Sequence, residues 1–111
     1  MATMSYPFDP RNKTVLNWVD GKFIARFDPA IPVYDSGLMH GKLVWSSPRL
    51  VRRRVFRLMD HLQKIRTSAE LNFWPRVPTD DEMIAAIRAT LIKNGREDGV
   101  HIRIMLTVGS E

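Results

Sequence analysis

Basic and aromatic side chains recur at spacings from which they could reach one small anionic ligand. Trp45, Ser47 and Arg49 alternate along a predicted strand, so they share one of its faces. Arg103 lies on the polar face of the last predicted strand. Simple exposure to solvent explains each of these residues alone, and their spacing does not by itself require that they converge. We therefore treat them as candidate binding residues, with solvation as the alternative.

Two more cations lie in the stretch DHLQKIRTSAELNF, residues 60–73. Leu62 and Ile65 belong to an apolar series with a 3.6-residue period, which predicts an amphipathic helix of about four turns. Lys64 and Arg66 fall on its polar side, where they either meet water or bind an anion such as a phosphate group.

Other kinds of site find little support. The chain has no cysteine, which excludes thiolate metal sites, disulfides and cysteine nucleophiles. His40, His61 and His101 are its only histidines, and none forms a metal-binding pair with i, i+4 spacing, so we expect no metal. Neither a G-x-S-x-G elbow nor a phosphate-binding glycine motif is present.

The composition and charge of the chain limit the classes of protein to which it can belong. The 111 residues are 44% hydrophobic and 26% charged, which suits one globular domain. A net charge of +5 favours an anionic partner without specifying one. We interpret the run Arg52–Arg54 as a solvated hairpin turn, because a nucleic-acid contact would also need neighbouring basic or aromatic groups that form a stripe, whereas a solvated turn needs nothing further. No secretory signal or apolar membrane span is visible, so we expect a cytoplasmic protein that binds neither membrane nor nucleic acid.

The order of elements predicts an α+β fold, in which an antiparallel sheet of hairpins carries two consecutive helices on one face. We expect an irregular arm at residues 1–13 and a single domain at residues 14–111. Within the domain we expect first a hairpin that turns at Asp20-Gly21 and then a loop at 28–41. A strand interrupted by Pro48 and a hairpin that turns within Arg52–Arg54 come next. The helix of residues 60–73, a second helix from the cap Thr79 to Gly95 and a strand at 100–108 complete the domain. The second helix is expected to bury Met83, Ile84, Ile87, Leu91 and Ile92.

Several motifs occur in a familiar order: W-V-D-G-K-F at 18–23, I-P-V-Y-D-S-G at 31–37, H-G at 40–41, V-F-R-L-x-x-H-L-x-K-I-x-x-S-A at 55–69, H-I-R at 101–103 and T-V-G at 107–109. From Thr14 onward the chain resembles the N-terminal small domain of class IV (fold type IV) pyridoxal-phosphate enzymes. These include branched-chain and D-amino-acid aminotransferases, R-selective amine transaminases and aminodeoxychorismate lyase.

The resemblance implies an enzyme that uses pyridoxal 5′-phosphate to move an amino group between an amino acid or amine and a 2-oxo acid. In the family the Schiff-base lysine lies in a larger domain that follows this one. We therefore expect it beyond residue 111, expect no catalytic residue within this chain, and expect the chain alone to be inactive. The resemblance also implies a homodimeric parent protein. The alternatives are a lyase of the aminodeoxychorismate type and, outside the enzymes, a stand-alone basic α+β module that binds nucleic acid or protein.

The resemblance also implies particular site residues. The arginine with which this domain contacts the cofactor phosphate falls on Lys64, with His61 and Ser68 matching around it. Lysine keeps the charge but lacks the guanidinium fork. Arg66 is expected to be solvated. The substrate-pocket positions fall on His40, Trp45, Ser47, Arg49 and Arg103. Branched-chain members carry tyrosine in place of His40 and glutamate in place of Ser46, and the Met39-His40 pair is more similar to the amine-transaminase branch.

Overall fold

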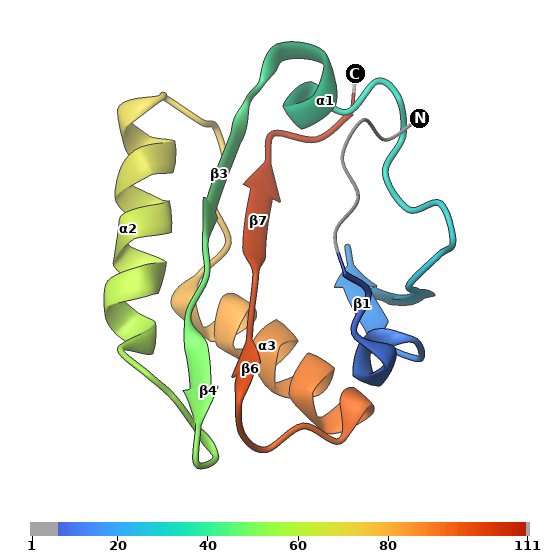
Figure 1. Ribbon diagram of the computed structural model, residues 1–111. Coiled ribbons are helices and arrows are strands. Elements are labelled where there is room, and N and C mark those ends of the chain that lie inside the picture. Colours follow the sequence, from blue (N-terminus) through green and yellow to red (C-terminus); the bar gives the residue numbers. More distant parts are fainter. Residues whose placement is uncertain (1–6, 111) are drawn as a thin grey trace. The chain divides into compact units, whose positions relative to one another are not determined.

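The computed structural model describes residues 7–110 and divides the chain into two compact units, residues 1–30 and 31–111 (Figure 1). The predicted arm, residues 1–13, lies partly outside the described residues, and its described part contains one 3-10 turn at Pro10–Asn12. Within residues 7–110 no helix is long and apolar enough to cross a membrane.

The first unit contains the predicted hairpin. Strands β1 (Leu16–Val19) and β2 (Lys22–Ala25) pair antiparallel through a two-residue turn. Both turn residues have positive φ, 48° at Asp20 and 83° at Gly21, as this type of tight turn requires. The Asp20-Gly21 dipeptide alone was therefore enough to predict this turn.

A charged pair lies at the start of the same unit. The Asp9 carboxylate accepts hydrogen bonds from the Arg11 guanidinium at 2.6 to 3.1 Å. This hydrogen bond, together with the negative charge of Asp9, raises the pKa of Arg11. Arg11 is fully charged in any case, so the raised pKa does not change its charge state.

Two strand pairs of the second unit form one antiparallel ribbon, which we call the central ribbon (residues 43–51 and 100–107; Figure 1). Its strands are β3 (Leu43–Ser46), β4 (Arg49–Val51), β6 (Val100–His101) and β7 (Ile104–Thr107), and β5 (Arg54–Val55) adds a hairpin to β4. β3 pairs with β7, and β4 with β6, in one continuous register. Pro48 interrupts the ladder because it has no N–H, although its carbonyl accepts the Ile102 N–H at 2.8 Å. The single strand predicted at 100–108 is therefore two short strands, broken opposite the proline.

Three helices complete the second unit. They are α1 (Ser36–His40), α2 (Leu58–Leu71) and α3 (Asp80–Asn94). The predicted ends of α3 are confirmed, since Thr79 and Glu82 form a capping box and Gly95 adopts φ 61° after its last turn. The predicted α+β class is also confirmed.

The core lies between α2, α3 and one face of the ribbon, here called the inner face. Leu62 and Ile65 of α2 and Met83 and Ile87 of α3 are its buried centre. Partly buried residues pack around them: Val44, Val55, Leu58, Ile84, Leu91, Ile102, Ile104 and Leu106. The prediction that Ile92 is buried was wrong. It is 73% exposed, because α3 has a narrower apolar face than the sequence suggests.

The hairpin between β4 and β5 turns at Arg52 and Arg53, within the predicted segment. Both arginines have positive φ, 49° and 68°, which costs a residue with a Cβ about 1–2 kcal/mol. The loop before β6 holds this turn in place. The Arg52 N–H donates to the Asp98 carboxylate at 2.8 Å, and the Arg53 N–H donates to the Glu97 carbonyl at 2.7 Å. Contacts distant in sequence thus impose a conformation that the arginines themselves disfavour.

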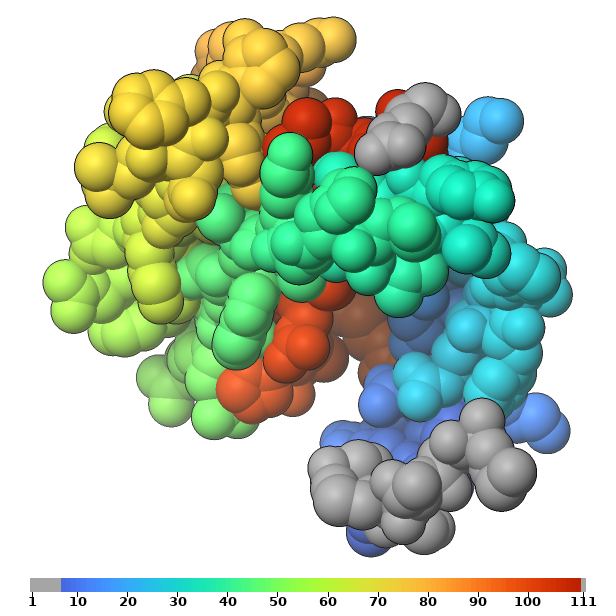
Figure 2. All heavy atoms as spheres, turned by 90° about the horizontal axis from the view of Figure 1, so that it is seen from above, coloured from blue at the N-terminus to red at the C-terminus, as the bar shows by residue number. Residues whose placement is uncertain are grey.

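Buried Asp35 fastens α1 to the end of β7. Its carboxylate accepts the Gly37 N–H at 2.8 Å and the Thr107 hydroxyl at 3.0 Å, and the Ser36 N–H donates to the Gly109 carbonyl at 2.8 Å. Figure 2 shows the green residues of this segment beside the red C-terminal residues. The predicted loop 28–41 therefore contains a short helix whose position is fixed by the last strand.

Candidate functional site

Trp45 and Arg103 form a stacked pair on the face of the central ribbon opposite the core, which we call the outer face. The Arg103 guanidinium lies 4.6 Å from the centre of the Trp45 ring. Trp45 pairs with Met105 across the ladder, so Arg103 is its diagonal neighbour, at a distance that long side chains bridge. The alternation seen in the sequence creates this contact, because odd-numbered residues of β3 and β7 share the outer face.

Arg49 and Ser47 belong to the same face. Arg49 pairs with His101, and the continuous register places Ser47 opposite Arg103. Arg49 and Arg103 are exposed, and no carboxylate pairs with either of them within residues 7–110. The outer face is thus a positively charged surface with an aromatic platform, which suits a planar anion such as a carboxylate.

His40 is the last residue of α1 and is exposed. Its backbone position follows from the anchored helix α1. The assignment of His40, Trp45, Ser47, Arg49 and Arg103 to a substrate pocket stays a prediction.

Lys64 lies apart from that surface. It is exposed on α2, which packs on the inner face, and no carboxylate pairs with it among the described residues. Its neighbour along the helix, His61, forms a 2.6 Å hydrogen bond between Nδ1 and the Oγ of buried Ser46. Strand β3 therefore touches both regions, through Ser46 on one face and Trp45 on the other.

The expectation that Arg66 is solvated was wrong. Its side chain is 23% exposed, and Nη2 donates to the Asp80 carboxylate at 2.5 Å and to the Pro78 carbonyl at 3.0 Å. The partner lies fourteen positions along the chain, so the sequence carries no local signal for it. Because Arg66 is already paired, Lys64 is the cation that α2 leaves for a ligand.

The exposed Lys64 side chain of α2 suits a phosphate group. A phosphate needs positive charge and several hydrogen-bond donors, and Lys64 supplies a mobile ammonium with three. The described residues offer no comparable metal site, since no three His, Cys, Asp or Glu side chains gather in them.

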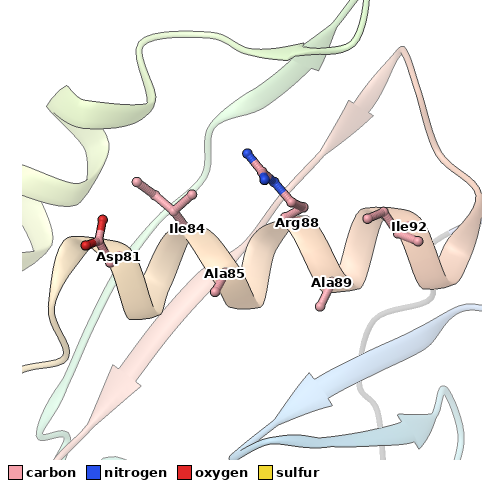
Figure 3. Close-up of a pocket in the computed structure, with 6 residues that line it drawn as sticks. All are labelled: Asp81, Ile84, Ala85, Arg88, Ala89 and Ile92. Carbon is pink, nitrogen blue, oxygen red and sulfur yellow. The ribbon is translucent and has the colours of Figure 1, made fainter.

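Two shallow hollows lie along α3. One, of about 400 Å³, is lined by α3 alone, with Ile84 and Arg88 on one side of the helix and Ala85 and Ala89 on the other (Figure 3). The second, of about 470 Å³, opens between α3 and the β4–β5 hairpin. None of the predicted site residues lines either hollow.

The fold and the sequence comparison together define the class of protein. The chain has the fold of the small α+β domain of class IV, fold type IV aminotransferases, and it resembles them in sequence as well, as the motifs predict.

Particular relatives make the comparison concrete. The chain is 37% identical over 102 residues to the branched-chain-amino-acid aminotransferase-like protein 2 of Arabidopsis thaliana, a match that covers 92% of this chain and 18% of that protein. Among solved structures, the branched-chain amino acid aminotransferase from Escherichia coli matches 87% of this chain and 34% of its own, with a TM-score of 0.75 and 27% identity.

A third match adds a ligand-bound example. A branched-chain amino acid aminotransferase solved in complex with N-(5′-phosphopyridoxyl)-L-glutamate has a TM-score of 0.75 at 23% identity, covering 89% of this chain and 34% of its own; at that identity it shows the fold alone. No family model matches the chain. The chain spans about a fifth of the length of the Arabidopsis relative.

Proposed function

We propose that this chain is the small domain of a pyridoxal-phosphate-dependent aminotransferase that moves an amino group between an amino acid or amine and a 2-oxo acid. In this proposal the Schiff-base lysine belongs to a larger domain of the same protein, and residues 14–111 form the domain described by the motifs. The parent protein is a homodimer, and this chain alone does not catalyse the reaction.

One observation carries the proposal: strand β3 lies between a cation suited to a phosphate and a face suited to a carboxylate. Ser46 of β3 contacts His61, one helical turn before Lys64, while Trp45 stacks with Arg103. A ligand with a phosphate at one end and an amino-acid carboxylate at the other would need these two features at two ends of one site. The phosphopyridoxyl-glutamate bound in the third matched enzyme is a ligand of that kind.

Each residue then has a defined task. Lys64 holds the phosphate by charge, and the Trp45 ring fixes the plane of the Arg103 guanidinium so that its N–H groups face the substrate carboxylate. Arg49 adds positive charge on the same face, and Ser47, being small, leaves room beside Arg103. When bound, pyridoxal phosphate supplies the electron sink for amino transfer.

The phosphate role is tested with Lys64→Ala in a protein that carries this chain together with the lysine-bearing domain. Loss of one charged hydrogen-bonding group should raise the dissociation constant of pyridoxal 5′-phosphate about tenfold or more. Lys64→Arg should preserve or tighten binding, because arginine adds a second donor. An unchanged dissociation constant in Lys64→Ala would sink the phosphate role.

A further inference from the structure

The hydrogen bond between Ser46 and His61 determines which nitrogen of the histidine carries its proton. Ser46 is only 2% exposed, and among the described residues its hydroxyl has one partner, Nδ1 of His61, at 2.6 Å. A buried hydroxyl that fails to donate its hydrogen is costly, so the Ser46 O–H donates to Nδ1. In the neutral ring the hydrogen of His61 is then on Nε2.

The Nε2–H of His61 faces the surface. His61 is half-buried, and no residue among 7–110 accepts a hydrogen bond from Nε2. Within the same residues, the one buried side-chain polar atom that lacks a partner is the Ser36 Oγ, so Nε2 reaches solvent. His61 therefore presents an outward N–H donor whose direction is fixed from behind by Ser46.

That donor lies beside Lys64. Residues three apart on a helix are neighbours on its surface, and His61 and Lys64 share the flank of α2 that turns away from Arg66. We infer that His61 is a second anion-binding residue of the Lys64 site, and that Ser46 is the positioning residue that holds it in the Nε2–H tautomer. The inference rests on the proposed function. It gives the site a hydrogen-bond donor of fixed direction, the Nε2–H of His61, which an arginine at position 64 would supply and the flexible side chain of Lys64 does not.

The tautomer is measured directly by long-range ¹⁵N–¹H correlation spectra of the complete chain labelled at histidine. We expect His61 to show a protonated Nε2 and an unprotonated Nδ1, and Ser46→Ala to shift it toward a mixture of the two forms. A wild-type His61 protonated at Nδ1 would overturn the inference, whatever the variants do.

Titration with inorganic phosphate, followed in the same spectra, tests the binding role. The Nε2 resonance of His61 should move as phosphate binds. His61→Asn places an amide near the Nδ1 position and removes the outer donor, so phosphate affinity should fall about three- to tenfold. His61→Gln places an amide near the Nε2 position, so its phosphate affinity should fall less than that of His61→Asn. Gln63→Asn, an exposed change on the same helix, is the matched control and should leave the affinity unchanged.

Two outcomes separate this inference from the proposed function. If Lys64→Ala weakens phosphate binding but His61→Asn does not, the His61 role is wrong and the phosphate site stands. If Lys64→Ala has no effect on either phosphate or pyridoxal 5′-phosphate, the proposed function fails, and the role of His61 in it fails as well. Equal losses in His61→Asn and His61→Gln would also contradict the role of the Nε2 donor.

Discussion

The Arg66 guanidinium donates to the Asp80 carboxylate at 2.5 Å, and so joins the middle of α2 to the first turn of α3. A second bond to the Pro78 carbonyl fastens the connector between the two helices. Asp80 also lies where a helix favours negative charge. The cation that looked equivalent to Lys64 in the sequence therefore stabilises the fold and is not available to a ligand.

We expect Arg66→Ala to lower the free energy of unfolding by about 1–2 kcal/mol, since it removes charged hydrogen bonds from a half-buried position. Lys64→Ala, on the exposed side of the same helix, should change it by less than about 0.5 kcal/mol. Urea unfolding of the two variants measures the difference. Equal effects would show that the Arg66 contacts add nothing to stability.

The β4–β5 turn should be improved by glycine. Arg53→Gly removes the cost of φ 68° and keeps the N–H that donates to the Glu97 carbonyl, so stability should rise by about 1 kcal/mol. Arg53→Ala keeps the unfavourable φ and loses the exposed 3.6 Å contact with Glu97, so it should bring no gain. Thermal unfolding distinguishes the two. A stabilised Arg53→Ala would mean that charge, not backbone conformation, limits the turn.

Gly37 has no room for a side chain. An added Cβ would lie 2.7 Å from Thr107 Cγ2 and 3.0 Å from Asp35 Oδ1. Gly37→Ala should therefore destabilise the chain by about 1–3 kcal/mol, as overpacking does elsewhere. Thr107→Ser removes the obstructing methyl group and keeps the hydroxyl that bonds Asp35, so the double variant should recover part of the loss. Chemical denaturation of the single and double variants tests this, and a lack of recovery would place the strain elsewhere.

Local patterns were enough to predict most of the fold. The Asp20-Gly21 turn, the Thr79 cap and the break at Pro48 depend on residues adjacent in the chain, whose backbone preferences decide the outcome. The pairing of Arg66 with Asp80 could not be predicted in this way, because it depends on how two helices dock. The prediction for Ile92 failed for a related reason, since helical periodicity gives the direction of an apolar face but not its width.

For the candidate site, too, the sequence predicted the local arrangement but not the contacts between distant elements. Alternation placed Trp45, Ser47 and Arg49 on one face, and the ladder register then added Arg103 to it. The tautomer of His61 had no signal in the sequence, because Ser46 lies fifteen positions away and only the packing of α2 on β3 brings it close.

The outer face gives a kinetic prediction. In a protein that carries this chain with the larger domain, Arg103→Ala should raise KM for the 2-oxo acid about tenfold, with a smaller change in kcat, because it removes a carboxylate contact. Arg76→Ala, an exposed change in the connector between α2 and α3, is the control, because it removes an arginine away from the outer face. Steady-state kinetics with both variants tests the role, and an unchanged KM in Arg103→Ala would exclude Arg103 from substrate binding.

Pro48 has a consequence for motion as well as for strand assignment. Its carbonyl accepts the Ile102 N–H, but it has no N–H to return a bond, so this rung of the ladder is held from one side only. The one amide of this rung, the Ile102 N–H, should therefore be less protected against hydrogen exchange than the paired amides of β3 and β4 on either side. The rung falls between Trp45 and Arg49, so we expect the two ends of the outer face to move separately if a ligand binds there.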